Sequence, residues 1–107
     1  MITILRYELT SAINDCELPV GYKILNVGVA TDNLGFEKIS IWCEVEVDEN
    51  LHPYHTERVR FLIYGTGAYM DDIVNFNPKY IGTVQKSNRY AFHIYKVDNK
   101  WVRLKRF

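Results

Sequence analysis

Strict alternation of apolar and polar side chains is the feature of this sequence that most limits its fold. Every second residue of ISIWCEVEVD (39–48) is apolar, and RVRFLIY (58–64) repeats the pattern with Val59, Phe61 and Ile63. Successive side chains of a strand point to opposite faces, so a period of two is typical of half-buried β-strands. Both segments are therefore predicted to be strands with one face in the core.

The polar residues of these two segments predict that they pair as a hairpin. With Glu46 opposite Arg58, Glu44 falls opposite Arg60, and the polar stretch DENLHPYHTE (48–57) supplies a long loop. Cross-strand pairs of this kind contribute about 0.2–1 kcal/mol each, and a slip of one residue would turn Glu44 and Glu46 toward the core. Cys43 is predicted to be buried, and the rest of the register is Trp42–Leu62, Val45–Val59, Cys43–Phe61 and Ile41–Ile63.

The remaining segments predict further strands. We expect them at 2–9 and 22–31, and a hairpin of 89–97 with 100–107 around Asp98-Asn99, two residues that tolerate the positive φ of tight turns. Gly28 is expected to allow a bulge or a closely packed neighbour within its strand. Residues 11–21, which contain a proline and a glycine, are expected to form a loop.

Together these patterns predict a mainly β fold. The chain of 107 residues is long enough to bury one core but too short for two, so residues 1–107 are expected to form a single compact domain. Its antiparallel, barrel-like sheet would contain six to seven strands. A short helix is expected at most once, at about 70–76, where Asp71 and Asp72 suit a first helical turn.

Charge and composition limit the classes of molecule that this protein is expected to bind. Lys+Arg and Asp+Glu are both 13, so the formal net charge is zero, whereas proteins that coat long nucleic acids usually carry a basic excess. The N-terminal segment lacks the long apolar stretch of a signal peptide, and no apolar run approaches the ~20 residues that span a bilayer. Two distant cysteines, Cys16 and Cys43, do not suggest a disulfide framework. We expect a cytoplasmic protein without long nucleic acid or membrane partners.

The glycine turn Gly65-Thr66-Gly67 is the motif most suggestive of a ligand. It is no dinucleotide fingerprint, because Met70 occupies the third glycine position, and it lacks the Gly-Lys-Ser/Thr of a P-loop. Glycines without Cβ can still expose backbone N–H groups to an anion. Two interpretations stay open, a structural turn or a ligand contact supported by Tyr64 and by the charges of Arg58 and Arg60.

Signals for catalysis or metal binding are weak. His52 and His55 provide only two potential metal ligands, whereas a zinc site needs three or four. The sequence also contains no nucleophile elbow. Adjacent Asp71 and Asp72 point in different directions and do not suggest an acid/base pair. We expect no enzyme, no metal and no cofactor.

The C-terminal segment KWVRLKRF combines aromatic and basic residues. If it is extended, Trp101 and Arg103 share one face, which suits a flat anionic ligand through stacking and charge-assisted hydrogen bonds. An edge strand protected by basic residues would explain the same pattern. Eight tyrosines and two tryptophans, several of them on outward strand faces (Tyr7, Trp42, Tyr64, and Tyr90 or Tyr95), favour interfaces, so a homo-oligomer is expected.

The order of these segments resembles a family of small uncharacterised accessory proteins encoded by tailed phages. In that family Gly-Thr-Gly is followed by His-Pro, whereas Ala68-Tyr69 stands here, so no site that depends on that histidine is carried over. The resembling stretches are ILRYEL (4–9), ELPVGYKILNVGV (17–29), ISIWCEVEVD (39–48), RVRFLIYGTG (58–67), YIGTVQ (80–85) and AFHIYKV (91–97).

The resemblance implies a small protein that acts in the cytoplasm of an infected host cell. Such proteins often bind host defence signals or block host enzymes. The expected function is therefore a non-enzymatic anti-defence protein that sequesters a small nucleotide-like anion. The alternative is an inhibitor that binds a host defence protein and no small molecule. The candidate ligand-binding residues are Arg58, Arg60, Tyr64, Gly65, Thr66, Gly67, Trp101 and Arg103.

Overall fold

A computed structural model describes residues 1–47, 56–71, 73, 76–87 and 89–97 of the protein. These residues form seven strands and no α-helix. The strands are β1 (Ile2–Leu9), β2 (Ile13–Pro19), β3 (Lys23–Thr31), β4 (Glu37–Glu46), β5 (Thr56–Gly65), β6 (Lys79–Gln85) and β7 (Ala91–Val97).

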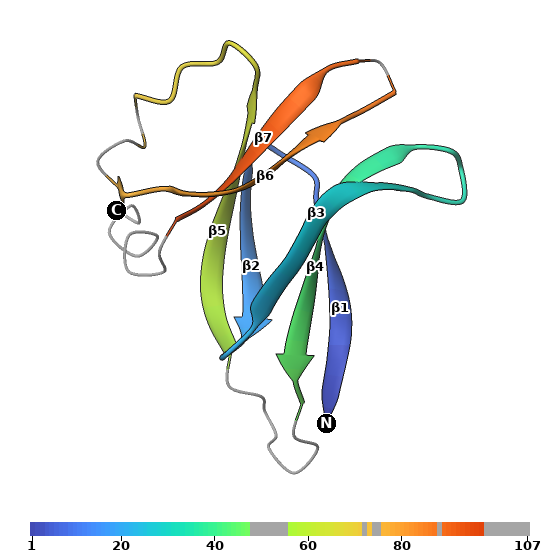
Figure 1. Ribbon diagram of the computed structural model, residues 1–107, viewed down its shortest axis with the longest axis vertical. Coiled ribbons are helices and arrows are strands. Elements are labelled where there is room, and N and C mark those ends of the chain that lie inside the picture. The colour runs from blue at the N-terminus through green and yellow to red at the C-terminus, as the bar shows by residue number, and fades with distance from the viewer. Residues whose placement is uncertain (48–55, 72, 74–75, 88, 98–107) are drawn as a thin grey trace.

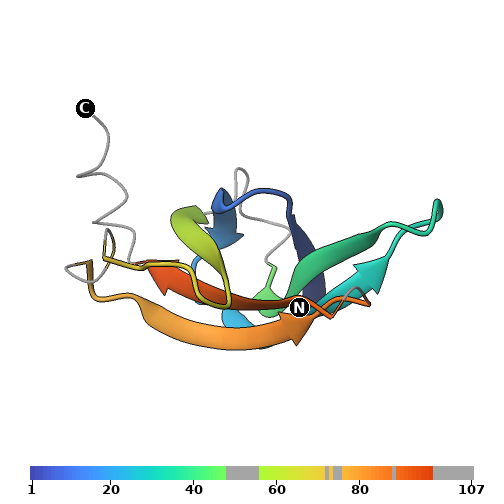
Figure 2. The same ribbon diagram turned by 90° about the horizontal axis from the view of Figure 1, so that it is seen from above.

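The strands are arranged in two antiparallel sheets, of order β1-β4-β3 and β2-β5-β7-β6. Figure 1 labels the strands, and Figure 2 shows them from above, where the two sheets curve around a shared interior. Strands β3 and β6 lie close together, but the sheets do not join into a closed barrel. The prediction of a mainly β, antiparallel fold with six to seven strands is confirmed.

Alternate residues from both sheets fill the interior between them. Fully burying an aliphatic or aromatic side chain of this size contributes about 1.5–3 kcal/mol. Cys43 is completely buried, as its place in the alternation predicts. The buried core consists of Leu9, Leu18, Ile39, Ile41, Cys43, Val45, Val59, Phe61, Val84 and Ile94.

The predicted hairpin of 39–47 with 58–64 is wrong, although the alternation behind it is right. Strand β4 pairs with β1 and β3, whereas β5 pairs with β2 and β7. Their apolar residues, such as Cys43 and Phe61, meet across the core from opposite sheets. Two apolar strand faces can be buried side by side or face to face, and alternation does not distinguish these arrangements.

Residues 11–21 are not a loop, because Ile13–Pro19 forms β2 at an edge of the second sheet. Strand β2 provides the carboxylates that pair with the arginines of β5, whereas the predicted hairpin gave this role to Glu44 and Glu46 of β4. Arg60 donates two hydrogen bonds to Asp15, of 2.7 and 3.0 Å, and Arg58 lies 3.9 Å from Glu17. The opposite-charge pairs expected of β5 therefore exist, but with a different neighbour.

The other predictions have mixed outcomes. Strands 2–9 and 22–31 are confirmed as β1 and β3, and Gly28 does have a close neighbour, because a Cβ there would lie 3.3 Å from the Trp42 ring. A register shift occurs between Ile24 and Asn26. No α-helix occurs among the described residues of 70–76, where the Ile73 N–H donates to the Met70 carbonyl and the Phe76 N–H, in 3-10 conformation, donates to the Ile73 carbonyl. The predicted partner strand 100–107 lies outside the described residues, and β7 pairs with both β5 and β6.

Candidate functional site

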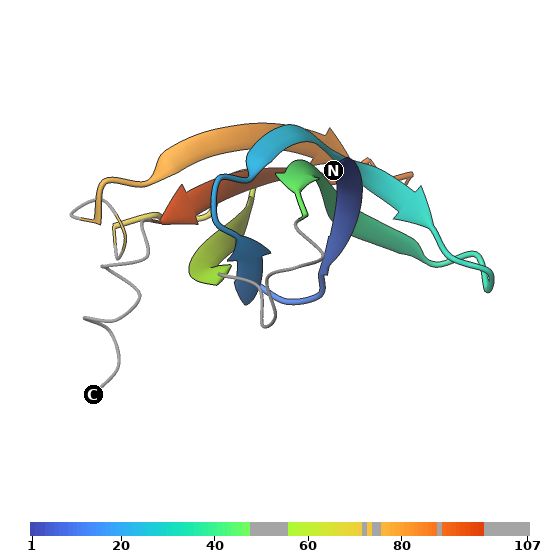
Figure 3. The same ribbon diagram turned by 90° about the horizontal axis from the view of Figure 1, so that it is seen from below.

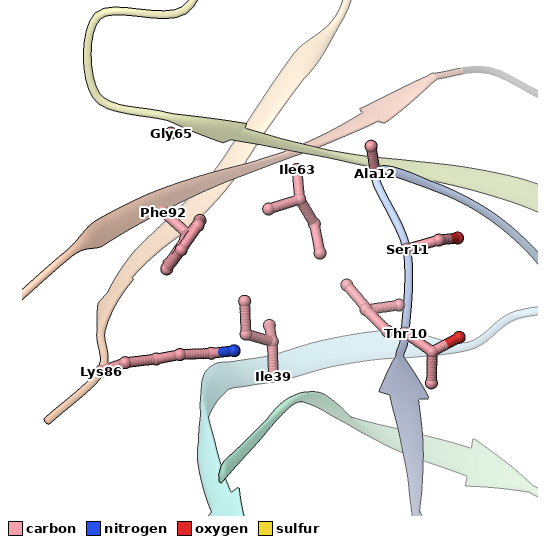
Figure 4. A pocket seen from close by; sticks show the side chains of 9 residues that line it. Thr10, Ser11, Ala12, Ile39, Ile63, Gly65, Lys86 and Phe92 are labelled. Atoms are coloured by element: carbon pink, nitrogen blue, oxygen red, sulfur yellow. The ribbon is translucent and has the colours of Figure 1, made fainter. Parts of the chain in front are cut away.

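A pocket of about 280 Å³ is lined by residues of the β1–β2 connection, the start of β4, the end of β5 and the β6–β7 hairpin. We call it the mouth pocket. Its floor is apolar, because Leu9 and Ile39 are 4% exposed and Ile63 joins them from the opposite sheet. Figure 4 shows its lining, which consists of Leu9, Thr10, Ser11, Ala12, Ile39, Ile63, Gly65, Lys86 and Phe92.

Lys86 gives the mouth pocket its positive charge. Its side chain extends beside the pocket toward Ile39 (Figure 4), and its ammonium nitrogen lies 5.4 Å from the centroid of the Phe92 ring. No ion pair neutralises Lys86 within the described part of the chain. A cation beside an aromatic ring and an apolar floor is suited to a small anion that carries an apolar or flat group.

Glu37 lies near this cation but is directed to another partner. Its carboxylate accepts hydrogen bonds from the Ser87 hydroxyl and from the Ser87 N–H at 3.1–3.2 Å. These bonds, and then the nearby charge of Lys86, lower the pKa of Glu37 below its ordinary value. Glu37 thereby joins the start of β4 to the β6–β7 turn and helps to place Lys86.

The side chain of Asn14 shapes the opposite wall. Its carbonyl oxygen accepts hydrogen bonds from the backbone N–H groups of Thr10 and Ser11, at 2.9 and 3.1 Å, and its amide donates to the Ser11 carbonyl. Asn14 is only 8% exposed, so these bonds satisfy a buried polar group. They hold the sharp connection that carries the chain from one sheet to the other.

The turn Gly65-Thr66-Gly67 borders the mouth pocket. Gly65 lines the pocket, and its carbonyl accepts a 3.0 Å hydrogen bond from the Ala68 N–H. Gly67 has φ of 92°, a value that side-chain-bearing residues rarely adopt. The segment is thus a true turn, and one of its residues also forms part of a pocket wall.

Thr66 does not line the mouth pocket, and its hydroxyl starts a chain of hydrogen bonds that runs from the turn after β5 to β7 and β6. Its hydroxyl lies 2.8 Å from His93 Nε2, and His93 Nδ1 lies 2.9 Å from the Thr83 hydroxyl. The Tyr80 hydroxyl completes the chain, 2.5 Å from that of Thr83. Both ring nitrogens of His93 are therefore engaged with hydroxyl groups.

Tyr64 belongs to a separate apolar cluster on the outer side of the second sheet. It packs against the buried residues Leu62, Ile73 and Val97. Its ring meets Tyr95 edge to face at 6.2 Å, and Tyr95 meets Tyr80 in the same way at 5.5 Å. The tyrosines thus stabilise the sheet and the segment that covers it, and Tyr64 does not line the mouth pocket.

The two arginines are not near the glycine turn. Gly65 lies five positions after Arg60 on the extended strand β5, and each position rises about 3.3 Å. The hydrogen bonds from Arg60 lower the pKa of Asp15 and raise that of Arg60 itself, so the charge of Arg60 is already compensated. The structure does not bring Arg58 and Arg60 together with Gly65 and Thr66, and Trp101 and Arg103 lie outside the described residues.

Sequence reasoning missed the residues that make the pocket. Lys86 and Phe92 flank the β6–β7 hairpin, and no sequence motif marks either residue. Thr10 and Ser11 were not predicted as site residues, because the sequence predicted a loop at 11–21 and not a sharp connection between two strands. One usable signal existed: Ser11 and Asn14 are three residues apart, a spacing typical of side chains that cap a turn.

The described residues contain no cluster of three or more histidine, cysteine or acidic side chains that could hold a metal ion. In the same residues, no helix is long and apolar enough to cross a membrane.

Comparison with known proteins identifies the family. No curated protein and no solved structure matches the chain significantly. A family model described as a domain of unknown function (DUF7352) matches residues 1–103, which is nearly the whole chain. The protein that carries this mouth pocket therefore belongs to the DUF7352 family.

Proposed function

We propose that the protein is a non-enzymatic binding protein that sequesters a small nucleotide-type anion in the mouth pocket. The observation that carries this proposal is the ammonium group of Lys86 beside an apolar pocket with an aromatic ring. Ligand sites are typically apolar clefts with a small number of placed polar or charged groups. Phe92 and Ile63 would contact the base, and Lys86 would neutralise a phosphate.

The size of the pocket narrows the ligand class. Ligand sites typically occupy about 300–1,000 Å³, and the mouth pocket of about 280 Å³ lies at the lower limit. One ring with one charged group fits this volume better than a dinucleotide does. In the phage setting that the resemblance implies, binding such a molecule would withdraw a defence signal from the host.

Thermal unfolding against a panel of nucleotides and nucleosides tests this proposal. A mononucleotide present at 100 times its dissociation constant should stabilise the protein by about 2.7 kcal/mol, and the matching nucleoside should act more weakly. Lys86→Met, which keeps the length of the side chain and removes its charge, should reduce affinity roughly tenfold or more, as expected for a hydrogen-bonded charge. Lys38→Met, outside the pocket lining, is the matched control and should bind like the wild type.

A second candidate is the protein-binding inhibitor, and exposed apolar residues at the β3–β4 turn favour it. Leu34 is 82% and Phe36 61% exposed, and exposed apolar groups concentrated at one place are typical of protein interfaces. If no nucleotide changes the melting temperature, the first proposal fails and this one stands. Equal binding by wild type and Lys86→Met would exclude the mouth pocket as the ligand site.

A further inference from the structure

Strand β1 lies at the border of the first sheet with one edge unpaired. It pairs with β4 from Ile2↔Glu46 to Leu9↔Ile39 without a register shift, and no strand in the described part of the chain pairs with its other edge. Figure 1 shows β1 at the right-hand side of the molecule, next to the marked N-terminus, and Figure 3 shows the same strand from below. An unpaired edge presents a row of backbone donors and acceptors to a possible partner strand.

The other three edge strands carry features that discourage such pairing. Strand β3 has Lys23 and a register shift after Ile24, and β6 has Lys79 and a register shift after Tyr80. Strand β2 carries two carboxylates and ends in a proline. Charged residues, bulges and prolines are the usual means of protecting edges. Strand β1 has no bulge, proline or lysine, and its two charged residues, Arg6 and Glu8, lie in its C-terminal half.

The N-terminal half of β1 is also apolar on its exposed surface. Ile2 is 68% and Ile4 58% exposed, and Leu5 is 37% exposed. The charged residues of the strand, Arg6 and Glu8, already pair with each other at 3.3 Å. The N-terminal half of β1 is thus an uncharged edge with exposed isoleucines, which is a typical site of strand addition.

The hydrogen-bonding pattern shows which backbone groups are available. The Met1 carbonyl accepts a hydrogen bond from the Val47 N–H, so odd-numbered residues of β1 direct their backbone groups toward β4. In an antiparallel ladder the direction alternates, and Ile2 and Ile4 therefore direct their N–H and C=O groups to the free edge. The exposed isoleucines and the available hydrogen-bonding groups thus belong to the same residues.

We propose that β1 is a self-association surface, and that a second copy of this chain adds its own β1 antiparallel to it. A twofold axis at Ile4 places that residue opposite itself, and places Leu5 opposite Thr3 and Ile2 opposite Arg6 of the second copy. Like charges do not meet in this register, and each copy uses the same patch, as a twofold interface requires. The two three-stranded sheets then become one six-stranded sheet.

The test is analytical ultracentrifugation of the full chain from about 10 to about 500 µM, a range that covers weak interfaces. The wild type should show a concentration-dependent monomer–dimer equilibrium. Ile4→Lys, which adds a charge to the free edge, should weaken dimerisation about tenfold or more. Leu34→Lys, a matched change at a more exposed apolar residue of the β3–β4 turn, should leave it unchanged.

A second variant tests the register and does not depend on the first. Opposed residues of a hydrogen-bonded antiparallel pair have Cα atoms about 5.5 Å apart, within the range that a disulfide bridges. In a Cys16→Ser background, Ile4→Cys should oxidise to a covalent dimer, and Leu34→Cys should not. A wild type that is monomeric throughout, a dimer that survives Ile4→Lys, or equal cross-linking at both positions would overturn the proposal.

Discussion

At the scale of single residues, Gly67 shows how one backbone conformation limits the choice of side chain. Its φ of 92° is left-handed, and a Cβ would meet no atom within 4 Å. Gly67→Ala should therefore destabilise the protein only through backbone strain, by about 1–2 kcal/mol. Gly65→Ala, at an equally open position without positive φ, should cost about 1 kcal/mol less. Urea denaturation of both variants measures this difference, and equal costs would contradict the explanation.

At the scale of strands, the Asp15–Arg60 pair joins β2 to β5. The pKa of Asp15 is lowered in the folded state, mainly by the hydrogen bonds from Arg60. Its contribution is therefore present above the unfolded pKa of about 3.9 and is lost as the pH falls through the lower folded value. Asp15→Asn should lower stability by about 1 kcal/mol at pH 7 and by less near pH 3. Urea denaturation at both pH values checks this, and a cost independent of pH would contradict it.

At the scale of the whole molecule, Cys43 reports on separation of the two sheets. It is completely buried between them, and burial, with a smaller effect of Cys16, raises its pKa to about 11. In a Cys16→Ser variant, thiol reagents at pH 8 should modify Cys43 only when the protein unfolds globally, because thiolate is the reactive form. The rate of Cys43 labelling should then increase with urea concentration in proportion to the equilibrium constant for unfolding. Rapid labelling in the native state would show that the core opens locally.

The sequence alone determined much of the local structure. Sequence patterns identified β1, β3, β4, β5 and β7. Alternation assigned Cys43 and Phe61 to the core, because burial of every second residue is a property of each strand by itself. The sequence also predicted a turn at Gly65-Thr66-Gly67, because positive φ is a conformational requirement of a single residue. The mainly β class followed from these local features.

The tertiary structure alone decided which strands became neighbours and where the pocket formed. The charges of Arg58 and Arg60 can be matched by any acidic strand, and Asp15 and Glu17 of β2 took the place expected for Glu44 and Glu46. The mouth pocket draws Leu9, Ile63, Lys86 and Phe92 from four separate parts of the chain. Such a site depends on the packing of one sheet on the other. No pattern within a single segment encodes that packing, because the same apolar face can be buried against several partners.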